Sequence, residues 1–196
     1  YFVRFGQGAL RYSLRAADVG LAVQESVDAF LALFPDGTAP NGDKRPIVEL
    51  NVDDSLPRVM LDDGAFAQII LNLLDNAATY GKKRMNRGHA PPVWIGVSVA
   101  RCMRCRKPWT LRHEWVRITV RDKGEGISPS DRKRIFRKFY RARDASTEYL
   151  SGVGLGLAVC RAAAEGHAGW IDVDSEPGEG SAFHVFLPVV SGESES

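Results

Sequence analysis

The sequence predicts an α+β fold in which a layer of helices covers one face of a mostly antiparallel sheet. Two segments, 18–34 and 64–80, carry apolar residues at helical spacing. Segments 93–100 and 115–121 alternate apolar and polar residues, which predicts a hairpin. Two further short strands close the chain. This mixture, with hairpins late in the chain, argues against a doubly wound parallel fold.

The predicted elements follow one another along the chain. The first helix starts after Asp18, a good N-cap residue, and ends at the turn formed by residues 35–37. The strongest helix, 64–80, places Phe66, Ile70, Leu73 and Ala77 on one face. The other predicted elements are strands at 47–52, 58–61, 93–100, 115–121, 171–173 and 182–187, and helices at 131–139 and 155–165.

Length and composition indicate one globular domain. The 196 residues are 44% hydrophobic and 26% charged, and a net charge of +2 gives no reason to expect a nucleic-acid partner. No apolar run is long enough to span a bilayer, so we expect no membrane contact by this chain, although its parent protein could be anchored. Three cysteines do not make a disulfide framework, which favours a reducing cytoplasm.

The ends of the chain predict its domain organisation. It begins at Tyr1 rather than at a methionine, so we expect a longer parent protein. Residues 1–14 are aromatic and basic and are predicted to end an upstream dimerisation or linker helix. The domain is predicted at 15–190, and 191–196 form a polar tail.

Two asparagines of the strongest helix are the first candidate ligands. Asn72 and Asn76 are four residues apart and therefore share a helix face, beside the apolar stripe. Amide oxygens at the edge of a buried helix can coordinate a hard cation such as Mg²⁺. Two solvated or capping asparagines would give the same spacing.

Two glycine-rich segments flank the other candidate contacts. Asp122 follows a strand and stands beside Gly124 and Gly126. Its carboxylate can accept a hydrogen bond from an exocyclic amine, and glycines let the backbone approach a flat ligand. A second set precedes a helix and consists of Gly152, Gly154 and Gly156. The N–H groups of a helix N-terminus suit phosphate, although each segment taken alone also fits an ordinary turn.

Cations and aromatic residues lie between the two glycine segments. The cations are Arg137, Lys138, Arg141 and Arg143. They precede or lie in a loop rich in Ser, Thr and Asp, and such a loop can close over a polyphosphate. Phe136 and Phe139 would anchor it by packing. A solvated basic helix would show the same run of charge.

These segments, in this order, resemble the ATP-binding catalytic domain of sensor histidine kinases. That family belongs to the superfamily of gyrase, the ninety-kilodalton heat-shock chaperone and the mismatch-repair ATPases. The matching segments are 71–76 (N box), 122–126 (first glycine box), 135–140 (F box), 152–157 (second glycine box) and 178–183 (closing turn). The resemblance covers about residues 15–188 and implies a two-layer α/β sandwich of the Bergerat type.

The resemblance also implies a site for ATP and Mg²⁺. Asn76 would bind the metal with Asn72 close by, and Asp122 would read the adenine amine, supported by Ser181 directly or through water. Residues implied at the phosphates or ribose are Tyr80, Lys138, Arg141, Gly154 and Gly156. Residues implied around the nucleotide are Gly124, Gly126 beneath the base, Ile127, Gly152 and Leu155. The residues implied in catalysis are Asn72, Asn76 and Lys138.

The implied activity is that of a protein-histidine kinase in a two-component system. The γ-phosphate would pass to a histidine on a separate dimerisation domain, in the same or a paired chain, and then to a response regulator receiver domain. His113-Glu114 resembles an acceptor start, but it abuts a strand and lacks the downstream proline pattern. We therefore expect the acceptor upstream of Tyr1 or on another chain, and this chain to be monomeric.

Departures from the family pattern leave two alternatives open. Thr79 stands where the family often has lysine, so a phosphate contact is missing or is supplied by Lys82 or Lys83. A non-catalytic interaction module would fit this departure. An ATP hydrolase of the same superfamily would need a glutamate where this chain has Asn72, which favours a kinase.

The connection 101–114 is basic and longer than the family usually needs. Cys102 and Cys105 form a CxxC, which is half of a zinc site, and His89 or His113 could add ligands. Reduced loop thiols or redox sensing are the other interpretations.

Overall fold

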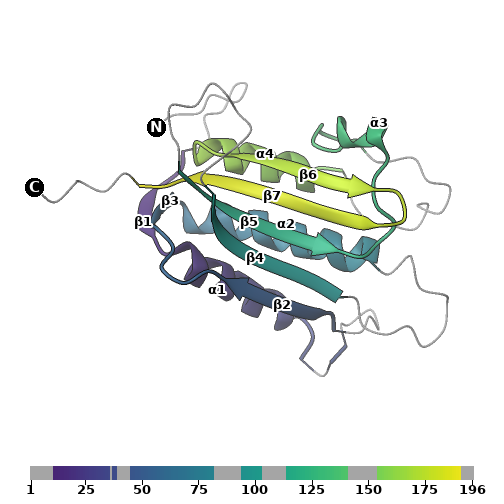
Figure 1. The fold of residues 1–196 in the computed structure, drawn as a ribbon, viewed down its shortest axis with the longest axis horizontal. Coiled ribbons are helices and arrows are strands. Elements are labelled where there is room, and N and C mark those ends of the chain that lie inside the picture. Colours follow the sequence, from purple (N-terminus) through teal and green to yellow (C-terminus); the bar gives the residue numbers. More distant parts are fainter. Residues whose placement is uncertain are drawn as a thin grey trace, which may run out of the picture.

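The computed structural model describes residues 11–35, 37–38, 45–81, 94–102, 114–140 and 154–190. The elements along the chain are β1 (Arg15–Ala17), α1 (Val19–Leu31), β2 (Ile47–Val52), β3 (Val59–Leu61), α2 (Asp63–Gly81), β4 (Trp94–Cys102), β5 (Trp115–Asp122), α3 (Pro129–Arg132), α4 (Gly156–Gly166), β6 (Trp170–Glu176) and β7 (Gly180–Pro188). Figure 1 shows α1, α2 and α4 lying along one face of the strands.

The main sheet has five strands in the order β2-β4-β5-β7-β6. Only β2 and β4 pair in parallel, and the other neighbours are antiparallel. The predicted hairpin of β4 and β5 is confirmed. β1 and β3 form a separate two-stranded antiparallel sheet. The predicted class, a mostly antiparallel sheet with helices on one face, is therefore correct.

The helix α1 begins as the sequence predicts. The carboxylate of Asp18 caps it by accepting a hydrogen bond from the Leu21 amide at 3.1 Å. The helix ends at Leu31, three residues before the predicted end, because the amides of Leu33 and Phe34 bond to carbonyls three residues back and tighten the last turn.

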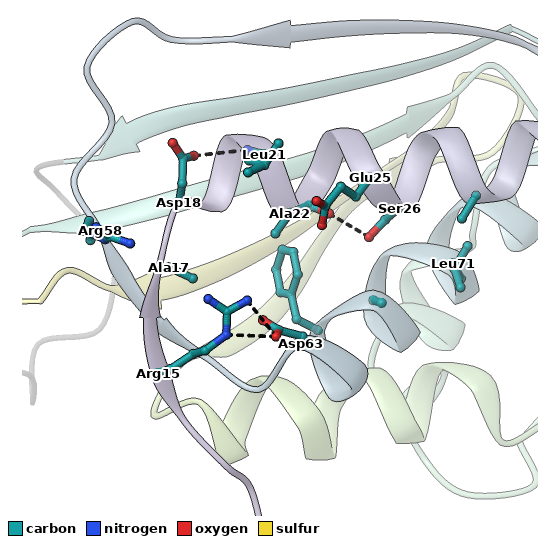
Figure 2. A pocket seen from close by; sticks show the side chains of 13 residues that line it. Arg15, Ala17, Asp18, Leu21, Ala22, Glu25, Ser26, Arg58, Asp63 and Leu71 are labelled. Carbon is teal, nitrogen blue, oxygen red and sulfur yellow. Dashed lines mark hydrogen bonds and ion pairs between the residues drawn. The ribbon is translucent and has the colours of Figure 1, made fainter.

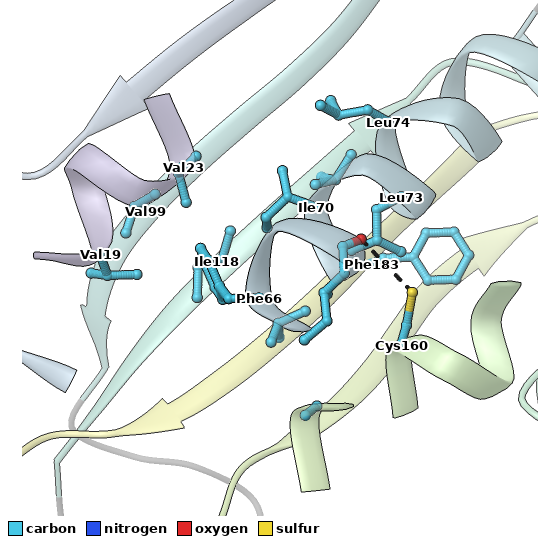
Figure 3. Packing of buried hydrophobic residues seen from close by; sticks show 14 of the residues in the cluster. Val19, Val23, Phe66, Ile70, Leu73, Leu74, Val99, Ile118, Cys160 and Phe183 are labelled. Atoms are coloured by element: carbon cyan, nitrogen blue, oxygen red, sulfur yellow. Dashed lines mark hydrogen bonds between the residues drawn. The ribbon is translucent and has the colours of Figure 1, made fainter. Parts of the chain in front are cut away.

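The helix α2 carries the centre of the hydrophobic core. Its buried residues are Phe66, Ile69, Ile70, Leu73, Leu74, Ala77, Ala78 and Gly81. Figure 3 shows Phe66, Ile70 and Leu73 of α2 in one buried cluster with Ile118 of the sheet and Cys160 of α4. Within the described ranges, no helix combines the length and apolarity needed to cross a bilayer.

The helix predicted at 131–139 is wrong for most of that length. The helix α3 covers only Pro129–Arg132, and turns follow it. Phe139 has a φ of 61°, in the left-handed region, which cannot occur inside a right-handed helix. The side chain of Tyr140 instead returns to α3, where its hydroxyl donates to Asp131 at 2.6 Å.

A buried histidine joins α4 to the start of α2. The Nε2 atom of His167 accepts a hydrogen bond from the Asp62 amide at 3.0 Å, so Nδ1 carries the proton and donates to the Ala163 carbonyl at 2.7 Å. Both ring nitrogens are engaged. Tyr12 packs against this ring, with centroids 5.8 Å apart.

Candidate functional site

Three buried polar residues lie in one row across the end of the sheet. The strand register pairs Asp122 of β5 with Ser181 of β7, and Ser181 with Ser175 of β6. Their exposed fractions are 5%, 8% and 7%, respectively. Because side chains alternate along strands, such a row places all three groups on one face of the sheet.

Asp122 is a buried carboxylate held by backbone amides. The Gly124 amide donates to its Oδ1 atom at 2.8 Å. Burial raises the pKa of Asp122 above its ordinary value, and hydrogen bonds from the Gly124 and Ser181 amides oppose that rise. The carboxylate is thus fixed in position as a hydrogen-bond acceptor.

The first glycine box fits closely against its neighbours. Gly126 has a φ of 72°, and a Cβ atom there would lie 1.9 Å from the Glu176 carbonyl oxygen. At Gly124 a Cβ atom would lie 2.7 Å from the Tyr80 carbonyl oxygen. The box therefore contacts the β6–β7 turn on one side and the C-terminal end of α2 on the other.

The N box contacts the second glycine box through Asn72. Its Nδ2 donates to the Gly156 carbonyl at 3.4 Å, and its Oδ1 accepts from Gln68 at 3.3 Å. Asn76 lies one turn further along α2 and is half-buried. Near the end of this helix, Tyr80 has an exposed fraction of 42%. The two asparagines therefore lie on the side of α2 that adjoins the start of α4.

The F box joins the second glycine box by a backbone hydrogen bond. The Phe139 amide donates to the Gly154 carbonyl at 2.9 Å. Phe136 anchors the segment by an edge-to-face contact with Phe183 of β7, with ring centroids 6.4 Å apart. Lys138, between the two phenylalanines in the chain, is exposed. The F box thus lies beside the N-terminus of α4.

The N-terminus of α4 has the character of an anion site. Leu155 occupies the N-cap position and makes no side-chain capping bond. The first N–H groups of a helix have no intrahelical partner and carry the positive end of its dipole. Gly154, with a φ of 71°, lets the chain enter this helix beside the F box.

The structure brings most of the predicted site residues to one end of the sheet. Arg141, Gly152 and Cys105 lie outside the described residues, and Cys102 ends β4. Among the described side chains, no group of three or more His, Cys, Asp or Glu residues is placed to hold a metal ion. The predicted zinc site on 101–114 stays a prediction.

A separate pocket lies between α1 and the start of α2. It has a volume of about 320 Å³ and is lined by Phe66 and the exposed ion pair of Arg15 with Asp63, among others. Figure 2 shows this ion pair at its edge. None of the predicted ligand-binding residues lines it.

Ser175 belongs to the site, and the sequence analysis missed it. Its Oγ accepts from the Ile127 amide at 2.8 Å and lies 2.7 Å from the Gly180 carbonyl oxygen and 3.0 Å from the Ser181 Oγ. The available signal was the alternation of β6, in which Ser175 falls on the same side as Ile171 and Val173. A serine at a core-facing position needs a hydrogen-bond partner.

Comparison with known proteins identifies the family. Residues 61–191 match the family described as histidine kinase-, DNA gyrase B- and HSP90-like ATPase, and the chain belongs to it. The resemblance seen in the sequence, to the ATP-binding domain of the sensor histidine kinase type, is confirmed.

Two curated relatives are adaptive-response sensory kinases. The chain is 38% identical over 151 residues to SasA from Prochlorococcus marinus subsp. pastoris, covering 76% of this chain and 35% of that protein. It is 32% identical over 170 residues to SasA from a Synechocystis strain, covering 86% of this chain and 38% of the relative. The chain therefore spans little more than a third of the length of these proteins.

Two solved structures share the fold. The mycobacterial sensor histidine kinase MprB superposes with a TM-score of 0.63 at 24% identity, covering 90% of this chain and 97% of that one. Full-length ShkA in complex with AMPPNP superposes with a TM-score of 0.66 at 24% identity, covering 95% of this chain and 33% of ShkA.

Proposed function

We propose that this domain binds Mg-ATP and donates the γ-phosphate to a histidine on a separate dimerisation domain. The observation that carries the proposal is the meeting of the N box, both glycine boxes, the F box and the closing turn at one end of the sheet. The curated relatives are sensory kinases, and the related ShkA structure holds an ATP analogue.

The polar row is assigned to the base and the start of α4 to the phosphates. Asp122 and Ser181 accept hydrogen bonds from the adenine amine, and the glycines of the first box lie beneath the base with Ile127. The N–H groups following Gly154 and the cation of Lys138 neutralise phosphate charge. The remaining assigned contacts are Tyr80, Arg141, Gly152, Leu155 and Gly156.

The donor chemistry on α2 fits a magnesium ion. Mg²⁺ takes oxygen ligands and keeps waters and substrate phosphates in its shell. We assign the Asn76 amide oxygen as its protein ligand, because the Asn72 amide is already bonded to Gln68 and Gly156. The ion would offset charge on the phosphate oxygens, and Asn72 would hold the second glycine box in place.

The proposed reaction is transfer to nitrogen rather than to water. The bond between the γ-phosphorus and its bridging oxygen breaks as a bond to an imidazole nitrogen forms, and ADP leaves. Hydrolysis would need a base to activate water, and Asn72 is no base. Both described histidines are engaged in the fold, since His184 contacts Thr119 and Asp174, and His167 is buried. The acceptor is therefore assigned to another domain.

The expected partners follow from the reaction. They are the phosphoacceptor domain, in the same or a paired chain, and a response regulator receiver domain. We place the domain in the cytoplasm, where ATP and a receiver domain are both present, without nucleic acid or membrane contact.

The test is a calorimetric titration of the folded 196-residue chain with a non-hydrolysable ATP analogue, with and without Mg²⁺. We expect binding that strengthens with the metal, and loss of the metal effect in Asn76→Ala. Phosphotransfer is tested in the full-length protein by labelling with γ-labelled ATP and checking for an acid-labile phosphohistidine. Absence of nucleotide binding in the folded chain would overturn the proposal and favour an interaction module.

A further inference from the structure

The hydroxyl of Ser175 has one proton and three hydrogen-bond partners. The Gly180 carbonyl, 2.7 Å away, can only accept, so Ser175 must donate its proton there. The Ile127 amide can only donate, and it does so to Ser175 at 2.8 Å. The remaining interaction, 3.0 Å from the Ser181 Oγ, can then form only if Ser181 is the donor.

This proton count fixes the direction of the Ser181 hydroxyl. Its proton is committed to Ser175, so toward a ligand the Ser181 oxygen offers lone pairs alone. Asp122, its register partner on β5, is also an acceptor. A nucleotide base placed against this row, as proposed above, therefore meets two acceptors, which match the two N–H bonds of an exocyclic amino group.

We propose that Ser175 is a positioning residue that sets the purine selectivity of the site. By holding Ser181 as an acceptor, it favours a purine with an amino group at the 6-position and disfavours one with an oxo group there. The inference rests on the proposed nucleotide site. It extends that site to a residue on β6, outside the family's sequence boxes.

Because the polar row is buried, the orientation of the Ser181 hydroxyl has a large effect on which base can bind. Asp122, Ser181 and Ser175 are each under a tenth exposed, so water has little access to correct a mismatched pair. A 6-oxo group facing two acceptors would lose its own hydrogen bond and leave at least one of theirs unmade, since the oxo base offers only its N1–H as a donor on this edge. If Ser175 loses its hydroxyl, the Ser181 proton is released and can turn to donate to the oxo group.

The test compares ADP with inosine diphosphate, which carries the oxo group, by titration calorimetry on the intact chain. The wild type is expected to prefer ADP by on the order of a hundredfold. Ser175→Ala should reduce this preference about tenfold, equivalent to about 1.4 kcal/mol. Ser175→Thr keeps the hydroxyl and should preserve the ratio within about twofold.

A double-mutant cycle separates orientation from general support of the site. In a Ser181→Ala background, Ser175→Ala should leave the ratio of the affinities for ADP and inosine diphosphate unchanged, because the hydroxyl that Ser175 orients is already absent. If Ser175 only supports the backbone, both nucleotides will weaken equally in Ser175→Ala, and the inference is overturned. A lower ratio of ADP affinity to inosine diphosphate affinity in Ser175→Thr would overturn the inference too.

The outcomes distinguish this inference from the proposed function. If the wild-type chain binds neither nucleotide, the proposed nucleotide site is wrong. If the chain binds ADP and Ser175→Ala does not change its preference for ADP, the nucleotide site stands and the proposed role of Ser175 is wrong. Should Ser175→Ala not fold, Ser175→Cys, with its weaker hydrogen bonds, replaces it and should also lower the ratio.

Discussion

Replacing Gly126 by alanine should disrupt the first glycine box far more than its place in a turn suggests. The residue combines a φ of 72° with a close approach, since an added Cβ atom would lie 1.9 Å from the Glu176 carbonyl oxygen. The chain also offers a matched control. Gly178 has a φ of 85°, yet a Cβ atom there would have nothing within 4 Å.

The two substitutions separate conformational strain from collision. The left-handed conformation costs a non-glycine residue about 1–2 kcal/mol, and this is all that Gly178→Ala should lose. The Gly178 amide would still donate to the Glu125 carbonyl. Gly126→Ala must also push the β6–β7 turn away. We therefore expect the free energy of unfolding to fall by about 4 kcal/mol in total, a loss that single substitutions reach only through a specific mechanism such as a steric collision.

Urea and thermal unfolding measure the difference. For a domain of this size, about 1 kcal/mol corresponds to about 2–4 °C in Tm. Gly178→Ala should therefore lower Tm by a few degrees and Gly126→Ala by about 10 °C or more. Because the displaced turn leads directly into β7, where Ser181 is the second residue, nucleotide affinity should also fall in Gly126→Ala.

The reasoning would be refuted by equal losses of stability in the two variants. Such a result would mean that the turn moves without cost and that the close approach of Gly126 to Glu176 does not constrain the site.

Three further predictions follow from burial. Because burial raises the folded-state pKa of Asp122, its contribution to stability is fully present below the unfolded pKa and is lost as pH rises through the raised value. The stability of the wild type relative to Asp122→Asn should therefore increase on acidification. Burial raises the pKa of the Cys160 thiol to about 12, so it should resist thiol reagents at pH 8 until the protein unfolds. Leu73→Ala, at a fully buried position, should cost about 2–5 kcal/mol.

Each of these predictions has its own control. A stability difference between wild type and Asp122→Asn that does not change with pH would contradict the first. Labelling of Cys160 is followed in a Cys102→Ser, Cys105→Ser background, where rapid reaction of the native protein would count against burial. For the core, Leu21→Ala is the comparison, since Leu21 has an exposed fraction of 58% and should change stability by less than about 0.5 kcal/mol.

Local sequence was sufficient for the elements whose signals are short-range. The apolar spacing of α2 and the N-cap at Asp18 require only neighbours within a few residues, and both are confirmed. The order of the boxes along the chain predicted the family. The helix expected at 131–139 failed because its spacing could not reveal the left-handed φ at Phe139, where the chain bonds to Gly154.

The arrangement of the candidate site could not be predicted from local sequence patterns, because it depends on contacts between distant strands. Alternation along β6 places Ser175 on the buried side of its strand, but a period of two does not say which residues lie beside it. The pairing of Asp122 with Ser181 and Ser175 depends on the register of three strands.

The sequence by itself thus predicted the family, the three long helices and a set of candidate ligand-binding residues, because these depend on residue type and short spacing. Tertiary structure alone decided which polar groups share a row, which way the Ser181 hydroxyl points, and why Gly126 differs from Gly178. All three properties depend on contacts between segments that are distant in the sequence. Gly126, for example, cannot be replaced without a collision because the backbone of Glu176 lies against it, whereas nothing lies against Gly178.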